Sequence, residues 1–150
     1  MRLALYQPDI PQNAGALIRL GACLGVEVDL IEPLGFILDD RRLKRAHMDY
    51  VEHVRIRRHS SWARFLGEKG PGRLLLLTRS GNLRYTEFGF AADDILLLGR
   101  ESAGAPPELH ERADARLRIP LRAGLRSLNV ALAAAMVLGV GLRQTGRFPP

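Results

Sequence analysis

Two unbroken apolar runs constrain the fold of this chain more than any other feature of its sequence. Leu74–Leu77 is a run of leucines, and Ile95–Leu98 repeats the pattern further along. Because successive side chains of a strand point to opposite faces, a run without a polar residue predicts a strand buried on both faces. Strands of this kind occur in parallel sheets that helices cover on both sides. The two runs therefore predict an α/β fold with a mostly parallel sheet flanked by helices.

Shorter patterns predict the remaining elements. Four further strands are expected, at 3–6, 26–31, 54–57 and 117–119, from β-forming residues between turn signals. Five helices are expected: from Asn13 as N-cap to Leu24, from Asp39 or Asp40 through Arg45, from Ser60 or Ser61 to Glu68, from Pro106 to Arg112, and from Asn129 to Arg143. No repeat or shift in composition marks a linker, so residues 1–150 are expected to form one domain.

Loops rich in glycine and proline follow three of the predicted strands, after Leu77, Leu98 and Ile119. In open α/β sheets, ligands bind at the carboxyl ends of the strands. Glycine in such a loop lets a ligand approach the backbone closely. The alternative is that Gly99, Gly104 and Pro120 are turn residues only. The residues by themselves leave both interpretations open.

Several familiar sites are absent from the sequence. Gly99–Gly104 has the spacing of a P-loop, but Ala105-Pro106 stands where the lysine and the hydroxyl residue would be needed. No Gly-x-Ser-x-Gly elbow occurs, which leaves a serine hydrolase unsupported. The four histidines lack metal-ligand spacing, so no metal is expected. They are His47, His53, His59 and His110.

The remaining composition favours a protein of the cytoplasm. Cys23 is the single cysteine, which excludes an internal disulfide, and its apolar neighbours predict a small buried side chain. The first residues lack the long apolar core of a signal peptide. Val130–Leu142 is apolar, but it is shorter than the ~20 residues that cross a bilayer. We therefore expect a packing helix there and no membrane partner.

The formal charge is +6, and of the 22 basic residues only Lys44 and Lys69 are lysine. Guanidinium groups match phosphate in a bidentate way, so a phosphate-rich partner is one explanation. A genome rich in arginine codons explains the bias equally well.

Four segments, taken together, resemble the three motifs of the SPOUT class of RNA ribose 2′-O-methyltransferases. The segments are Asn13-Ala14-Gly15 with Arg19, Leu98–Gly104, Arg118–Leu121 and Ser127-Leu128-Asn129. The resemblance is closest to the small single-domain members that modify the wobble nucleotide, the tRNA (cytidine/uridine-34) 2′-O-methyltransferases. Leu5–Pro11, Ile31–Phe36 and Asp39–Leu43 also resemble that subgroup, so the likeness covers nearly the whole chain.

The resemblance implies a fold and partners that the strand pattern does not reach. It implies a C-terminal segment threaded into a deep trefoil knot, which is the SPOUT fold. It implies a homodimer with two cofactor sites near its interface. The implied cofactor is S-adenosylmethionine, which leaves as S-adenosylhomocysteine, and no metal is needed. The implied substrate is the anticodon arm of tRNA.

The same resemblance implies roles for individual residues. The implied cofactor-binding residues are Leu77, Gly99, Glu101, Ile119, Pro120, Ser127 and Leu128. The implied catalytic residues are Arg19, Asn13, Ser127 and Asn129. Arg19 would grip the RNA phosphate and stabilise the developing alkoxide, because a guanidinium is not normally deprotonated. Asn13 has a simpler alternative as a helix cap alone.

Basic residues would hold the RNA through its phosphates. The expected ones are Arg41, Arg42 and Arg45, with Lys44, Arg55, Arg57 and Arg58. Phosphate contacts position an RNA without reading its sequence. Two alternatives to this function therefore remain. One is the same chemistry on another RNA such as ribosomal RNA, and the other is a non-catalytic RNA-binding module with this fold.

Overall fold

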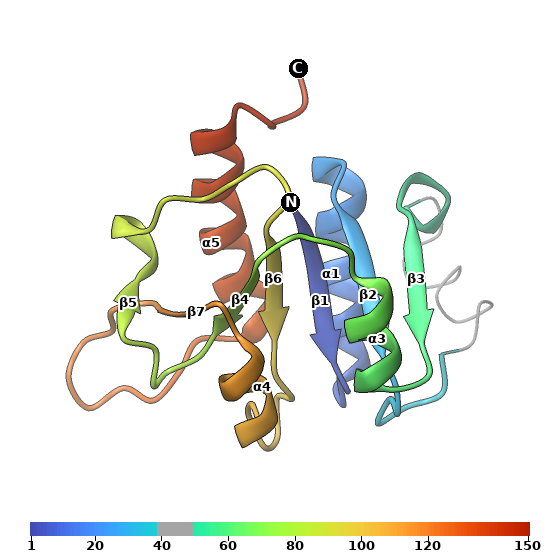
Figure 1. Cartoon of the computed structure of the whole chain (residues 1–150), viewed down its shortest axis with the longest axis horizontal. Coiled ribbons are helices and arrows are strands. Elements are labelled where there is room, and N and C mark those ends of the chain that lie inside the picture. Colours follow the sequence, from blue (N-terminus) through green and yellow to red (C-terminus); the bar gives the residue numbers. More distant parts are fainter. Residues whose placement is uncertain (39–49) are drawn as a thin grey trace.

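A seven-stranded, all-parallel sheet forms the centre of the protein (Figure 1). The computed structural model describes residues 1–38 and 50–150. The strand order is β3-β2-β1-β6-β4-β7-β5. The bounds are β1 Arg2–Tyr6, β2 Glu27–Ile31, β3 Ile56–His59, β4 Leu74–Leu77, β5 Leu83–Arg84, β6 Ile95–Leu98 and β7 Ala115–Arg118. The predicted α/β class and parallel sheet are confirmed.

Helices cover both faces of the sheet, which makes three layers (Figure 1). α1 (Pro11–Leu24) and α5 (Val130–Thr145) pack on one face, and α3 (Trp62–Glu68) and α4 (Pro107–Arg112) pack on the other. The central strands contribute to both cores in alternation. Leu96 and Leu98 of β6 face the α1 and α5 side, whereas Ile95 and Leu97 face the α3 and α4 side. This alternation is why the runs contain no polar residue.

Two of the predicted helix caps are present in the structure, and a third is not. Ser61 caps α3, where its side chain accepts from the backbone N–H of Arg64, and Asn129 caps α5. Both predictions are confirmed. The prediction for α1 is wrong, because this helix begins at Pro11 with Ile10 as N-cap. Proline is well suited to the first helical position, where no N–H is needed. Asn13 therefore lies within the first turn and does not cap it.

Two further predictions are wrong. β3 begins at Ile56 and not at residue 54, because a 3₁₀ turn, η1 (Val51–His53), precedes it with Val54 as its C-cap. Val54 packs over α1, where a Cβ added to Gly21 would lie 3.3 Å from its Cγ2. Cys23 is exposed on α1 and is not a buried residue. The helix expected from Asp39 or Asp40 to Arg45 lies outside the described residues.

The sheet order decides where a ligand can bind. β6, β4 and β7 are direct neighbours, and all three run in the same direction. Their carboxyl ends at Leu98, Leu77 and Arg118 therefore meet at one edge, as the sequence predicted. No helix in the described part of the chain is long and apolar enough to cross a membrane.

Candidate functional site

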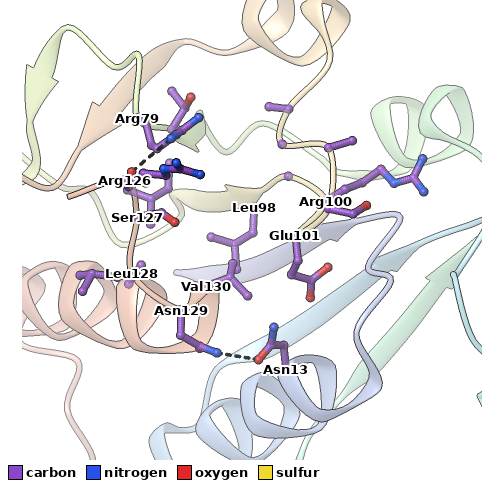
Figure 2. A pocket seen from close by; sticks show the side chains of 18 of the residues that line it. Asn13, Arg79, Leu98, Arg100, Glu101, Arg126, Ser127, Leu128, Asn129 and Val130 are labelled. Carbon is purple, nitrogen blue, oxygen red and sulfur yellow. Dashed lines mark hydrogen bonds between the residues drawn. The ribbon is translucent and has the colours of Figure 1, made fainter. Parts of the chain in front are cut away.

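A pocket of about 790 Å³ opens at this edge of the sheet. Its size is typical of cavities that hold a cofactor or small ligand. The loops after β4, β6 and β7 form its walls, together with the first turns of α1 and α5 (Figure 2). Apolar side chains line much of it, and they are Ile10, Leu77, Leu98, Ile119, Leu121, Leu128, Val130 and Ala133.

The loop after β6 is closed on itself. The backbone N–H of Arg100 donates to the carbonyl of Gly104 at 3.1 Å, and the N–H of Gly104 donates back at 2.8 Å. Gly104 has a φ of +70°, which favours glycine. A Cβ on Gly99 would lie 2.8 Å from the backbone nitrogen of Ala105, so the loop also needs glycine there. These contacts hold Glu101 and Ser102 at a fixed place on the pocket wall.

The segment between β7 and α5 forms the opposite wall. Residues 120–129 are all exposed, and a turn forms where the N–H of Leu125 donates to the carbonyl of Arg122 at 3.2 Å. Arg79 of the loop after β4 donates from Nη1 to the carbonyl of Arg126 at 3.3 Å (Figure 2). The two loops are thereby joined across the pocket mouth.

Two asparagines connect the helices at the base of the pocket. Asn129 uses its Oδ1 to accept the backbone N–H groups of Ala131 and Leu132, at 2.8 and 3.3 Å. Its Nδ2 donates to Oδ1 of Asn13 at 2.8 Å (Figure 2). The carbonyl oxygen of Asn13 is thus occupied, and no hydrogen bond from its side-chain amide group is formed within the described part of the chain. Asn13 is not the cap of α1, because Ile10 holds that position.

A pair of carboxyl groups, Asp9 and Glu101, links the segment before α1 to the loop after β6. The backbone N–H of Asp9 donates to Glu101 Oε2 at 3.0 Å, and the Ser102 hydroxyl donates to Asp9 Oδ2. Hydrogen bonding to Glu101 and Ser102 lowers the pKa of Asp9 to about 2. Burial, followed by the contact with Asp9, raises the pKa of Glu101 above its ordinary 4.5. Arg100 Nη2 is 3.9 Å from Asp9 Oδ2 and neutralises part of the charge.

Arg19 lies outside the pocket. It sits on the exposed side of α1, and its Nη2 donates to the hydroxyl of Tyr50 at 3.2 Å. Its guanidinium carbon also lies 4.6 Å from the centre of the Tyr50 ring, which is a cation–π contact. Tyr50 is held in turn because the N–H of His53 donates to its carbonyl at 3.1 Å.

The basic residues of β3, and Arg55 just before it, are paired with acids of β2 and the loop after β2. Arg55 contacts Glu27 at 3.5 Å, Arg57 contacts Glu27 and Asp29, and Arg58 contacts Glu32. By contrast, four arginines near the pocket mouth have no carboxylate within 4.0 Å in the described part of the chain; they are Arg79, Arg118, Arg122 and Arg126. Arg41, Arg42 and Arg45, expected to bind RNA, lie outside the described residues.

The structure brings most of the predicted site residues together. The pocket is lined by Asn13, Leu77, Gly99, Glu101, Ile119, Ser127, Leu128 and Asn129. Pro120 and Arg19 are not among its lining residues. Sequence reasoning missed Arg79 and Arg126, whose meeting depends on two distant loops. Asp9 was also missed, because its segment, Leu5–Pro11, predicted no role for it. Among residues 1–38 and 50–150, no three His, Cys, Asp or Glu side chains could hold a metal ion.

Sequence comparison places the chain among methyltransferases. Residues 1–139 match the family described as SpoU rRNA Methylase. A tRNA (cytidine(34)-2′-O)-methyltransferase of Beijerinckia indica is 58% identical over 147 residues, which cover 96% of this chain and 91% of that protein. A protein of the same name from Ancylobacter novellus is 53% identical, covering 99% of this chain and 95% of that protein.

Solved structures agree with this placement. One that addresses the 2-OH methylation of C/U34 on tRNA superposes with a TM-score of 0.88 at 43% identity, covering 95% of this chain and 94% of that chain. An AdoMet-bound rRNA methyltransferase from Sinorhizobium meliloti superposes with a TM-score of 0.84 at 27% identity, covering 95% of this chain and 55% of that one. With the motif residues gathered around one pocket, this chain belongs to the SpoU rRNA methylase family.

Proposed function

We propose that this chain transfers a methyl group from S-adenosylmethionine to the ribose 2′-hydroxyl of nucleotide 34 of tRNA, a cytidine or uridine. The observation that carries the proposal is the pocket itself, in which residues from all the resembling motifs line one cavity. Relatives at 58% and 53% identity that are named for this reaction support the choice of substrate.

The pocket suits the cofactor by its size and by its lining. Leu77, Leu98 and Ile119 offer apolar walls for an adenine ring, and the backbone of Gly99 and of the loop after it offers polar partners. Glu101 supplies a carboxylate that can face a hydroxyl or a positive charge. Ser127 and Leu128 close the other side. When bound, the cofactor supplies an activated methyl group on a sulfonium.

The polar residues have separate roles in the proposed reaction. Asn13 and Asn129 orient the ribose by hydrogen bonds, and Ser127 adds a hydroxyl on the same side. Much of the rate acceleration then comes from positioning, because methyl transfer needs an in-line approach. Arg19, exposed on α1, grips the RNA phosphate and stabilises charge that develops nearby.

The proposed RNA partner is the anticodon arm of tRNA, which the protein would bind in the cytoplasm. Arginines without acidic partners at the pocket mouth support a phosphate-binding surface there. Arg41, Arg42 and Arg45 are proposed to extend it. The β3 arginines contribute less than the sequence predicted, since Glu27 and Glu32 offset their charge.

We also propose a homodimer. On the outer side of α5, Leu132 is 63% exposed and Met136 is 43% exposed. Leu128, at the edge of the pocket, is 39% exposed. Apolar side chains gathered in this way are typical of a subunit contact. Sedimentation equilibrium tests the proposal: the native protein should sediment at twice the chain mass, and Leu132→Arg should sediment at the chain mass. A monomeric native protein contradicts it.

The threading of the chain is a further part of the proposal. We propose that residues 1–150 act as one domain whose C-terminal segment forms a deep trefoil knot. The match of residues 1–139 to the SpoU rRNA methylase family supports this threading, because the resemblance to that class implies it. An experimental electron-density map that traces residues 119–145 tests it directly.

A second candidate function is the same chemistry on ribosomal RNA. The name of the matching family and the rRNA methyltransferase of Sinorhizobium meliloti favour it. Bulk tRNA and ribosomal RNA offered separately, with a tritiated methyl donor, distinguish the two. The proposal expects label in tRNA only, and label confined to ribosomal RNA replaces it with the second candidate.

A further inference from the structure

Two contacts with one aromatic residue hold the side chain of Arg19 on the exposed side of α1. Its Nη2 donates to the Tyr50 hydroxyl at 3.2 Å, and its guanidinium carbon lies 4.6 Å from the centre of the Tyr50 ring. An arginine without such contacts samples many rotamers, and fixing it on a ligand costs conformational entropy. The contacts with Tyr50 lower that cost before any ligand binds, because part of the freedom is already lost.

Tyr50 is in turn fixed to the helix that carries the arginine. It is the N-cap of η1, where the N–H of His53 donates to its carbonyl at 3.1 Å. Val54 follows that turn and lies over Gly21 of α1, where an added Cβ would be 3.3 Å from Val54 Cγ2. The same Cβ would be 2.6 Å from the carbonyl oxygen of Val26, so the position needs glycine. The close approach seats the turn, and the tyrosine with it, against α1.

The contact with Tyr50 leaves most donors of the guanidinium for a ligand. A guanidinium carries five N–H groups in a planar fork, and the tyrosine hydroxyl takes one of them. A phosphate presents two oxygens that match an edge of this fork. In the described part of the chain, no carboxylate lies within 4.0 Å of Arg19. Its charge is therefore not offset by those residues.

We propose that Tyr50 is a positioning residue, which holds the Arg19 guanidinium in the orientation that binds a phosphate of the RNA. The inference rests on the methyl transfer and on the role of Arg19 proposed above. Tyr50 does not line the pocket, so it acts on the reaction through Arg19 alone. The ring is half-buried, and the guanidinium covers one of its faces. Both facts favour positioning over direct stacking of the ring on a nucleobase.

The first measurement is the single-turnover rate of methyl transfer, with saturating cofactor and RNA. Tyr50→Phe keeps the ring and loses the hydroxyl, so the rate should fall by about fivefold, the usual effect of one hydrogen bond. Tyr50→Leu loses the cation–π contact as well, and its rate should fall by about 20-fold. Cofactor affinity, measured by calorimetry, should be unchanged in both variants. Native rates in both variants, or a defect that lies in cofactor affinity, would overturn the inference.

A double-mutant cycle on RNA affinity shows whether Tyr50 acts through Arg19. The Kd for RNA is measured for the native protein, for Tyr50→Leu, for Arg19→Ala and for the variant with both changes. Tyr50→Leu should weaken binding by about fivefold in the native background and should have no effect in the Arg19→Ala background. A ring that stacks on a nucleobase would instead weaken binding by the same factor in both backgrounds. That second result excludes positioning.

Phe88→Leu is the matched control, because it removes a contact of the same kind elsewhere. The guanidinium carbon of Arg73 lies 5.1 Å from the centre of the Phe88 ring, and neither residue lines the pocket. Methyl-transfer rate and RNA affinity should both stay at the native values in Phe88→Leu. If they fall as far as in Tyr50→Leu, the effect is a general one of stability, and the assignment of Tyr50 is wrong.

The contact itself can be measured without RNA, which separates this inference from the proposed function. Nuclei above an aromatic ring resonate upfield, so the Arg19 Hδ protons of the free native protein should lie upfield of those of other exposed arginines. The displacement should persist in Tyr50→Phe and disappear in Tyr50→Leu. If neither tRNA nor ribosomal RNA accepts label, the methyl transfer fails, whereas these resonances still report on the contact. Identical Arg19 resonances in the native protein and in Tyr50→Leu would refute the positioning.

Discussion

Asn129 Nδ2 donates a 2.8 Å hydrogen bond to Asn13 Oδ1, and so joins two residues that are 116 positions apart. The same Asn129 caps α5 with its other amide atom. One side chain therefore starts the C-terminal helix and fixes the first turn of α1. It also sets which atoms of Asn13 face the pocket, because the occupied carbonyl leaves the amide hydrogens for a ligand.

Two substitutions of Asn129 should separate these contributions. Asn129→Asp keeps an oxygen for the cap but cannot donate to Asn13, so it should retain most of the stability and lose activity. Asn129→Ala should lose activity and also ~1 kcal/mol of free energy of unfolding, the usual value of an N-cap. Urea unfolding and methyl-transfer rates measure both effects. Equal stability of the two variants contradicts the capping role.

Gly99→Ala should damage the cofactor site. The new Cβ would lie 2.8 Å from the nitrogen of Ala105 and 2.9 Å from the carbonyl carbon of Gly104, which are backbone atoms that cannot move independently. We expect cofactor affinity to fall by about tenfold or more, which corresponds to ~1.4 kcal/mol. Gly67→Ala on α3 is the matched control, because a Cβ there meets nothing within 4 Å. Calorimetry that finds both variants alike would refute the loop geometry.

Arg19 and Tyr50 should act as a unit. Arg19→Ala should abolish methyl transfer and leave cofactor binding nearly intact, since Arg19 does not line the pocket. Tyr50→Phe loses the hydroxyl contact but keeps the ring beneath the guanidinium, whereas Tyr50→Leu loses both. The rate of methyl transfer should therefore fall in both Tyr50 variants, and it should fall further in Tyr50→Leu than in Tyr50→Phe. Loss of cofactor affinity in Arg19→Ala would place Arg19 in the other half of the site.

The two groups of arginines should differ in their contribution to RNA affinity. Arg122→Gln and Arg126→Gln remove charges without acidic partners in the described chain, and each should reduce the slope of log affinity against log salt by about 1. Arg55→Gln removes a charge already paired with Glu27, so it should change the slope less. Filter binding of tRNA at several salt concentrations measures these slopes. If Arg55→Gln changed the slope more than the other two substitutions, the RNA would bind at β3 and not at the pocket mouth.

Glu101→Gln should stabilise the free protein at neutral pH. The folded-state pKa of Glu101 is raised, so its protonated form is favoured by folding, and ionisation costs stability as pH rises through that pKa. Glutamine removes this cost and keeps an oxygen for the Asp9 N–H. The melting temperature should exceed that of the native protein at pH 7, and the gain should vanish below pH 4.5. A gain that is the same at both pH values would point to packing and not to charge.

Local sequence determined the centre of the fold. The bounds of β4 and β6 were predictable because a short run without polar residues is typical of a strand that is buried on both faces of a sheet. Ser61 and Asn129 were predictable as caps because capping depends on the adjacent backbone. β5 was not predictable, because Leu83–Arg84 carries too few residues for a pattern and exists by pairing with β7.

The position of the site and the residues of its motifs could be predicted from the sequence, but the contacts between them could not. Strand ends located the pocket, and resemblance named most of its lining residues. Partnerships across long sequence distances were not predictable: Asn13 with Asn129, Arg79 with Arg126, and Arg19 with Tyr50. The pairing of Arg55 and Arg57 with Glu27 was also hidden, since it requires β2 and β3 to be neighbours.

Methylation of the ribose of nucleotide 34 in tRNA is the reaction that remains to be measured on this enzyme. The most direct measurement is transfer of a tritiated methyl group to bulk tRNA, followed by nuclease digestion and mapping of the labelled nucleoside. We expect label in 2′-O-methylcytidine or 2′-O-methyluridine at position 34, and none with Arg19→Ala. Label on a base, label at another position, or no transfer to tRNA would contradict it.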